Sequence, residues 1–246
     1  MASVVLTLSE TALPGLGEAL ADLPVDIARH PLLSFAEPES WDALDQAIAQ
    51  ISEYAACAVT SPRAAAALLE RAARAGSESL RGRVVWAPGA ATAAVLRGTG
   101  ADLRVPDRAG EDDEGAAAVL ARAMLDGGTG SPILFACGDR RTDALPTMLL
   151  AAGRAVHEVV CYRTVLASDE AARAAVRAAD VLVVGSPSVA GLLARAASTG
   201  TRPDLLAIGV TTADAASACG WHPAAVASAP TVTALAAGVR ALLATH

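Results

Sequence analysis

Two segments of the chain place a Ser-Pro pair between an apolar run and a stretch rich in alanine and leucine. They read "VTSPRAAAALLERAA" from Val59 to Ala73 and "VGSPSVAGLLARAA" from Val184 to Ala197. Each predicts a buried strand leading into a helix, with Ser61 or Ser186 as the N-cap and the proline at the first helical position, where its missing N–H is no loss. Because the first amides of a helix have no partner within it, the sequence predicts two anion-binding helix starts.

Hydroxyl side chains gather at these helix starts and at a second repeated motif. Gly-x-x-Thr-Ala occurs at 89–93 and again at 209–213, each time after an apolar run that predicts a strand. The hydroxyl candidates for a ligand site are Ser61, Thr92, Ser186, Ser188, Thr211 and Thr212. Hydroxyls beside free helix amides suit a ligand with several anionic groups, held without a metal or a cofactor.

Other kinds of catalytic site find little support in the residues. All 19 basic residues are arginines, and the absence of lysine excludes Schiff-base chemistry, a pyridoxal phosphate anchor and a Walker lysine. The glycines of Gly15–Leu20 form only part of a dinucleotide fingerprint and follow a turn, which indicates loop closure. The acidic residues at 112–114 are adjacent, so nothing sets two of them across a cleft as acid and base. Ser61 and Ser186 have no evident His and Asp partners, so they are predicted as caps rather than nucleophiles.

Composition and charge narrow the class of partner and the compartment. The chain has 246 residues, 53% of them hydrophobic, which is enough to form two domains. Its net charge of -7 and its few aromatic residues argue against nucleic acid binding. No apolar run approaches the ~20 residues of a membrane span, and the first residues lack the basic region of a secretory signal. We therefore expect a cytoplasmic protein.

Histidine and cysteine do not form a metal-ligand pattern. The four histidines have no ligand spacing, and the widely separated cysteines predict buried free thiols rather than disulfides or a metal site. The cysteines are Cys57, Cys137, Cys161 and Cys219.

The repeats extend over the whole chain and predict its architecture. A Leu-Pro pair precedes each of the two Ser-Pro segments, at 13–14 and at 145–146. The sequence therefore consists of two similar halves, 1–126 and 130–246. Each half reads strand, helix, strand, helix, strand, helix. Continuous apolar strands that alternate with helices predict parallel sheets covered on both faces, and hence two doubly wound α/β domains. Such sheets bind ligands where the carboxyl ends of the strands meet the helix starts.

Seven motifs, taken in order, resemble the uroporphyrinogen-III synthase family. They are "TSPRAA" at 60–65, "GAATA" at 89–93, "ILFACGDRRTDALPTMLLAAG" at 133–153, "VCYRTV" at 160–165, "GSPS" at 185–188, "AIGVTTA" at 207–213 and "APTVTALAAGVRAL" at 229–242. Each motif alone is ordinary in α/β proteins. Together they cover nearly the whole chain in the family's order.

The resemblance implies two flavodoxin-like or Rossmann-like α/β domains, joined by a two-stranded linker, with a cleft between them. The chain would begin in one domain, build the whole of the other, and return. Residues 1–33 and 166–246 would then form the first domain and 36–162 the second, with linkers at Leu32–Phe35 and around Tyr162–Val165. The repeats alone fit this crossing and a side-by-side pair of halves equally well.

The reaction that the resemblance implies is the cyclisation of the linear tetrapyrrole hydroxymethylbilane to uroporphyrinogen III. Water leaves the terminal hydroxymethyl group, and ring D attacks through a spiro intermediate, fragments and recloses inverted. The substrate carries eight carboxylates, which the helix starts would bind through their amides without a lysine. No cofactor is implied, and the protein would act as a monomer on this small molecule.

The family's tyrosine, thought to assist departure of the hydroxyl, corresponds to Tyr162, whose phenol can donate a hydrogen bond. Spacing alone favours a linker tyrosine with an apolar ring and a solvated hydroxyl. Arg63 either faces an anion from the first helical turn or is a solvated arginine. The residues that match the family's binding motifs are Ser61, Arg63, Thr92, Ser186 and Thr212.

The chain departs from the family's pattern at three places. Val59 stands where an aromatic residue commonly precedes Thr-Ser-Pro, and the Thr7-Leu8 pair stands where a basic residue commonly follows the first strand. Thr142 replaces an arginine, and Arg140 or Arg141 is the candidate to substitute for it. At least one carboxylate contact is therefore expected to differ.

Two other functions stay open at this stage. A non-catalytic ligand-binding or regulatory protein could keep the two-lobed scaffold and lose the reaction, because a fold alone does not confer a function. An appended DNA-binding helix pair would favour that function, and the sequence shows none. An enzyme acting on sugar phosphates or nucleotides would be expected to show a phosphate loop or a metal cluster, and the sequence has neither.

Overall fold

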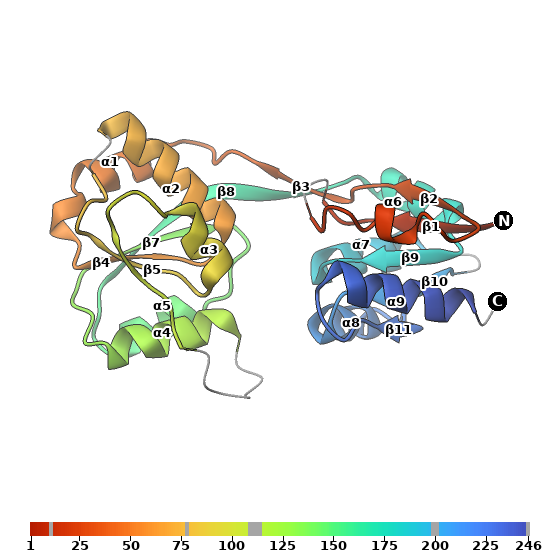
Figure 1. Ribbon diagram of the computed structural model, residues 1–246. Coiled ribbons are helices and arrows are strands. Elements are labelled where there is room, and N and C mark those ends of the chain that lie inside the picture. The colour runs from red at the N-terminus through yellow and green to blue at the C-terminus, as the bar shows by residue number, and fades with distance from the viewer. Residues whose placement is uncertain (10–11, 77–78, 108–114, 198–201, 245–246) are drawn as a thin grey trace. The chain divides into compact units, whose positions relative to one another are not determined.

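The computed structural model describes residues 1–9, 12–76, 79–107, 115–197 and 202–244. Contacts within the chain divide it into two units (Figure 1). Unit 1 consists of Met1–Ser34 together with Val165–His246, and unit 2 is Phe35–Thr164. The sequence halves 1–126 and 130–246 are therefore not the folding units, because each of them contributes to both.

Unit 1 is built on a five-stranded sheet in the order β11-β10-β9-β1-β2, with all neighbouring pairs parallel. Its strands are β1 (Ala2–Leu6), β2 (Val25–Arg29), β9 (Val181–Val184), β10 (Asp204–Ala207) and β11 (Ala225–Val226). Alternate strand residues face opposite sides, so that Val5 packs with α6, α7 and α8, whereas Val4 packs with α9 and the turn η1. These helices are α6 (Asp169–Ala178), α7 (Pro187–Ala196), α8 (Val210–Ala218), α9 (Val232–Leu243) and η1 (Glu18–Leu20).

Unit 2 is built on a six-stranded sheet in the order β3-β8-β7-β4-β5-β6. Its strands are β3 (Leu33–Ala36), β4 (Ala56–Val59), β5 (Val84–Trp86), β6 (Asp102–Arg104), β7 (Ile133–Gly138) and β8 (Val156–Leu166). One core joins the sheet to the segment from α1 to α3, and a second core joins its other face to α4 and α5. These elements are α1 (Asp42–Ala49), η2 (Ile51–Glu53), α2 (Pro62–Ala75), α3 (Ala90–Val95), α4 (Ala116–Asp126) and α5 (Ala144–Ala151). The predicted α/β class with helices on both faces of parallel sheets is confirmed.

The two sheets share one strand order, and this explains the repeats. The order β6-β5-β4-β7-β8 in unit 2 corresponds to β11-β10-β9-β1-β2 in unit 1. The pair β7-β8 comes last in unit 2, whereas its counterpart β1-β2 begins the chain. In each unit the strand order reverses at a central pair of neighbouring strands. This pair is β4 and β7 in unit 2 and β9 and β1 in unit 1, and the strands that follow each of its members are added on opposite sides. Ligands bind at the carboxyl ends of such a pair in open α/β sheets.

The helix expected between β1 and β2 is absent from the described residues there, where only the 3-10 turn Glu18–Leu20 occurs. Pro14 and two glycines interrupt this segment, and Gly15 has a φ of +88°, a left-handed conformation that suits glycine. The segment therefore closes a loop, as Gly15–Leu20 predicted.

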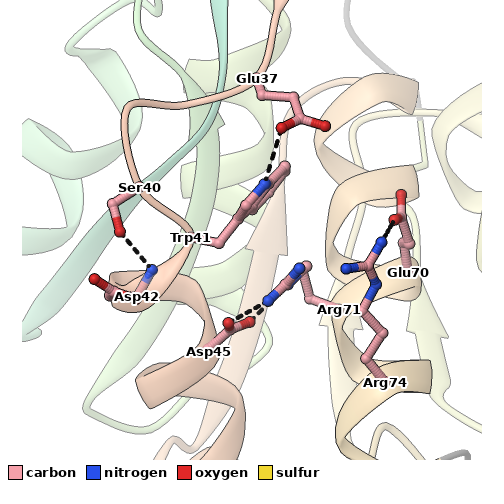
Figure 2. A network of polar contacts seen from close by, with 8 residues as sticks. All are labelled: Glu37, Ser40, Trp41, Asp42, Asp45, Glu70, Arg71 and Arg74. Carbon is pink, nitrogen blue, oxygen red and sulfur yellow. Dashed lines mark hydrogen bonds and ion pairs between the residues drawn. The ribbon is translucent and has the colours of Figure 1, made fainter.

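A polar network fixes the segment that follows β3 (Figure 2). Arg71 on α2 donates to the Asp45 carboxylate on α1 through Nε and Nη2, so the two helices are joined. These hydrogen bonds hold the pKa of Asp45 below its usual value. The guanidinium carbon of Arg71 also lies 5.2 Å from the ring centre of Trp41, whose indole N–H donates to Glu37 at 3.4 Å. The backbone carbonyl of Glu37 accepts a hydrogen bond from Arg163 on β8 at 3.0 Å. The end of β3 is thus tied to both α1 and β8.

Three of the four cysteines are buried free thiols as predicted, whereas Cys219 is exposed. Burial raises the pKa of Cys57 to about 12, of Cys137 to about 11 and of Cys161 to about 12. Removing each thiol from water disfavours its charged form.

We expect the free energy of unfolding to fall steeply above pH 9. Between pH 9 and 11 the unfolded thiols have lost their protons while the folded thiols keep them, so unfolding releases protons and becomes easier as pH rises. Each buried thiol contributes a slope of about 1.4 kcal/mol per pH unit in this window. Urea unfolding between pH 8 and 11 measures the slope, which Cys161→Ala should reduce. An equal slope in the unchanged protein and in this variant would contradict the assignment.

Candidate active site

Both Ser-Pro segments form the predicted capped helix starts. Ser61 follows β4, and its Oγ accepts a hydrogen bond from the Ala64 N–H at 3.1 Å, with Pro62 as the first residue of α2. Ser186 follows β9 in the same way, and its Oγ accepts from the Val189 N–H at 3.3 Å. The two N-caps are confirmed, and the proline that follows each of them has no N–H that would need a partner.

Tyr162 on β8 lies beside the first of these helix starts. Its hydroxyl and Ser61 Oγ are 3.2 Å apart and form a hydrogen bond in which either group can donate. The ring lies over Gly138 at the end of β7, where an added Cβ would be 2.4 Å from Tyr162 Cζ and 2.7 Å from its hydroxyl oxygen. Cβ atoms essentially never come this close to a non-bonded heavy atom, so an alanine at this position would force the Tyr162 ring to shift.

Phe35 and Arg63 pack beside the phenol. The rings of Phe35 and Tyr162 meet edge to face, with centres 5.6 Å apart. The guanidinium carbon of Arg63 lies 3.9 Å from the centre of the Phe35 ring and 5.9 Å from that of Tyr162. Such contacts between a cation and a ring contribute about 0.5–1 kcal/mol at exposed sites. Arg63 is therefore oriented by the rings, and its positive charge is close to the phenol.

A cavity of about 300 Å³ opens at this point of unit 2. Its walls are Thr60, Ser61, Pro88, Gly115, Ala116, Ala117, Phe135, Gly138, Arg140, Arg141, Thr142 and Tyr162. Residues at the carboxyl ends of both β4 and β7 line it, so the cavity is located where the strand order of unit 2 reverses. This is the edge at which the sequence predicted a ligand site.

The arginines that follow β7 lie in the same wall. Arg141 forms ion pairs with Glu158 and, at 2.7 Å, with Asp143, so part of its charge is already neutralised. Arg140 lines the cavity and is exposed, as is Thr142. Of the two candidates to replace the family's arginine, Arg140 therefore has the more accessible side chain.

Thr92 belongs to a neighbouring cavity of about 540 Å³ that shares Pro88 and Ala116 with the first. Its side chain is 4% exposed in the first turn of α3. The start of α3 therefore offers a ligand mainly backbone and methyl groups.

The other hydroxyl candidates form a separate group in unit 1. Ser186 and Ser188 lie at the start of α7, and Thr211 and Thr212 lie at the start of α8. Thr211 is exposed, whereas Thr212 is 3% exposed, as its counterpart in unit 2 is. These four residues occupy the carboxyl edge of the unit 1 sheet.

The Thr7-Leu8 pair, which stands in place of a basic residue, is part of the packing of unit 1. Thr7 is fully buried, and its hydroxyl donates to the Val183 carbonyl at 2.8 Å. Leu8 lies against Gly185, where an added Cβ would be 2.3 Å from Leu8 Cδ2. The departure from the family's pattern thus replaces a charge at this edge with an apolar contact.

Sequence reasoning missed two residues of the site, Phe35 and Gly138. Gly138 ends a fully buried strand, and a glycine inside a strand signals that another group approaches the backbone closely. Phe35 carries no such local signal, because its contacts come from residues distant in the sequence. No group of three or more His, Cys, Asp or Glu side chains able to hold a metal ion occurs among the described residues.

These features define a protein of two doubly wound α/β units with a ligand cavity at a carboxyl edge. The family model described as uroporphyrinogen-III synthase HemD (HEM4) matches residues 16–237. The match covers most of the chain, which therefore belongs to the uroporphyrinogen-III synthase family. Comparison with curated proteins gave no match.

Solved structures of synthases share the fold. A mutant uroporphyrinogen III synthase from the extremely thermophilic bacterium Thermus thermophilus matches with a TM-score of 0.67 and 17% identity, over 100% of both chains. The Helicobacter pylori enzyme matches with a TM-score of 0.65 and 18% identity, over 98% of this chain and 100% of the other. At this level of identity, the likeness supports the two-domain α/β fold.

The resemblance read from the seven motifs is confirmed, and with it the class of enzyme. The chain is a uroporphyrinogen-III synthase, a cyclising lyase of tetrapyrrole biosynthesis, and its family acts on hydroxymethylbilane. None of the helices described here is long and apolar enough to span a membrane.

Proposed function

We propose that Tyr162 donates a hydrogen bond to the hydroxyl that leaves hydroxymethylbilane, and that the cavity of unit 2 receives the reacting end of the substrate. The observation that carries this proposal is the 3.2 Å contact between the Tyr162 hydroxyl and Ser61 Oγ in the wall of that cavity. Without substrate, the Tyr162 hydroxyl can donate its hydrogen bond to Ser61 Oγ, which orients the phenol. When the substrate hydroxyl replaces Ser61 Oγ as the acceptor, the phenol proton passes to the substrate oxygen, which leaves as water.

Binding of the substrate carboxylates is assigned to helix starts and arginines. In unit 2 Arg63, in the first turn of α2, offers its backbone N–H, and its guanidinium lies next to Tyr162. In unit 1 we assign the starts of α7 and α8 to further carboxylates, through Ser186 and Thr211 and the amides around them. Each helix start contributes about 0.3–1 kcal/mol with a carboxylate. Because the chain has no lysine, arginines and backbone amides must balance the eight charges.

Ring inversion follows from positioning in this proposal. Loss of water leaves a reactive cation at the end of a flexible chain, which can close directly or through the spiro intermediate. Holding the carboxylates fixes which carbon of ring D meets the cation, and such positioning can supply about 7–11 kcal/mol of a barrier. The test is to supply fresh hydroxymethylbilane, oxidise the product and separate the porphyrin isomers. Isomer III supports the proposal, and isomer I alone would contradict it.

We expect Ser61→Ala to lower the rate of isomer III formation about tenfold or more, because it removes the partner that orients a proton donor. It also removes an N-cap, which costs about 1 kcal/mol of stability. The matched control is Ser168→Ala, which removes the cap of α6, where Oγ accepts from the Ala171 N–H at 3.2 Å. Stability should fall in both variants, whereas the rate of isomer III formation should fall in Ser61→Ala alone. Equal rates in Ser61→Ala and Ser168→Ala would show that Ser61 does not orient the proton donor.

We further propose that the enzyme works as a cytoplasmic monomer without a nucleic acid partner. The net charge of -7 supports the last point. Light scattering after gel filtration should give a mass near 24.6 kDa, and a mass near twice that value would contradict the monomer.

A further inference from the structure

Strand β8 contains one residue more than β7 at the point where Tyr162 lies. Cys137 is opposite Val160, but the next residue of β7, Gly138, is opposite Tyr162. Cys161 is therefore the extra residue of a β-bulge. A bulge changes the side to which the following residue points, and bulges occur next to active sites for this reason. Here the shift places the Tyr162 ring over Gly138.

Asp139 makes two contacts with β8 immediately after this bulge. Its backbone N–H donates to the Tyr162 carbonyl at 3.1 Å, and its side-chain Oδ1 accepts from the Thr164 N–H at 2.8 Å. The two contacts lie on either side of Arg163. They hold the backbone of β8 both at the tyrosine and two residues beyond it.

These contacts replace strand pairing that β7 no longer provides. β7 ends at Gly138, whereas β8 continues to Leu166. On that side of β8, the Asp139 carboxylate occupies the place that a carbonyl of a longer β7 would take. A carboxylate also accepts a stronger hydrogen bond from an N–H than a neutral oxygen does.

We propose that Asp139 is a positioning residue for the reaction: its carboxylate holds the bulge of β8 and thereby aims the Tyr162 hydroxyl at Ser61 and the substrate. The inference rests on the proposed role of Tyr162. Asp139 does not contact the phenol hydroxyl, so it acts through the backbone of β8 alone. A displacement of about 1 Å at a reacting group can cost about 10²-fold in rate.

The experiment compares Asp139→Ala and Asp139→Asn with the matched control Asp180→Ala. Asp180 lies in unit 1, where its Oδ2 accepts from the Ser3 N–H at 2.7 Å, so this control loses a similar contact between strands. We expect Asp139→Ala to lower kcat for isomer III about 10²-fold with little change in KM, since it misplaces a group that acts in the chemical step. Asp139→Asn keeps an acceptor oxygen and should recover most of the rate. Asp180→Ala should change neither constant.

A spectroscopic readout separates positioning from loss of folding. The chain has two tyrosines, so tyrosine labelled with ¹³C at Cζ alone gives two NMR signals, which Tyr54→Phe assigns. Asp139→Ala should move the Tyr162 signal and leave that of Tyr54 in place. An unmoved Tyr162 signal, or movement of both signals, would overturn the inference.

A double-mutant cycle distinguishes failure of this inference from failure of the proposed function. In the Tyr162→Phe background, Asp139→Ala should cause little further loss of kcat, because the group that it positions is gone. A full additional loss there would overturn the inference while leaving Tyr162 in its role. If Tyr162→Phe alone had no effect on kcat, the proposed function and the inference would both fall.

Discussion

Replacing Tyr162 with phenylalanine should lower the rate of uroporphyrinogen III formation about 10²-fold or more, the range that a positioned proton donor contributes. The substitution removes one oxygen and keeps the ring that packs on Phe35, Arg63 and Gly138. It therefore removes the donor for the leaving hydroxyl with little loss of packing. The measurement is the initial rate of isomer III formation from hydroxymethylbilane, with the free energy of unfolding recorded beside it.

The matched control is Tyr54→Phe, which also removes a phenol hydroxyl from unit 2. The Tyr54 hydroxyl bonds to His157 Nδ1, and the two rings stack with centres 5.9 Å apart. Neither residue lines the cavities described above. Tyr54→Phe should change stability slightly and the rate hardly at all, so equal rates in the two variants would remove Tyr162 from the chemical step.

Local chemistry explains which parts of the fold could be predicted from the sequence. The caps at Ser61 and Ser186 were predictable because a capping serine bonds to an amide three residues on, and the following proline has its φ preset for a helix. Buried parallel strands were predictable because they are apolar on both faces. The helix expected between β1 and β2 was wrong, because Pro14 and Gly15 interrupt the apolar residues that suggested it, and only the glycines of Gly15–Leu20 indicated the loop.

The contacts that make the site are non-local, and this limited what could be predicted. Ser61 and Tyr162 are 101 residues apart, and they meet because β4 and β8 flank β7 and because β8 bulges at Cys161. Neither the strand order nor the bulge is encoded in residue spacing. The repeated Gly-x-x-Thr motif is evident in the sequence, but the sequence does not show that its threonines are buried. Burial of Thr92 and Thr212 depends on the packing of the helices against the sheets.

Replacing Gly138 with alanine should abolish most synthase activity and destabilise the protein by about 1–3 kcal/mol, the usual cost of overpacking. The new methyl group would lie 2.4 Å from Cζ and 2.6 Å from Cε2 of Tyr162, so the ring has to move. The ring is half-buried against the core of unit 2, and Asp139 fixes its backbone. Movement therefore displaces the hydroxyl from Ser61 and from the cavity. Urea unfolding and the isomer III rate measure the two effects.

A second variant separates the clash from any general weakness of the strand. Tyr162→Ala removes the ring, so in that background Gly138→Ala should cost little further stability, as expected for two residues in direct contact. Activity should stay low in the double variant, because the phenol is absent. Gly238→Ala is the matched control in unit 1, where the added Cβ would be 2.8 Å from Leu206 Cδ1 on the sheet, and no residue of the unit 2 cavity is in this contact. It should lose stability and keep its rate. Additive losses of stability in the Gly138 and Tyr162 pair would show that the ring does not dictate glycine at the end of β7.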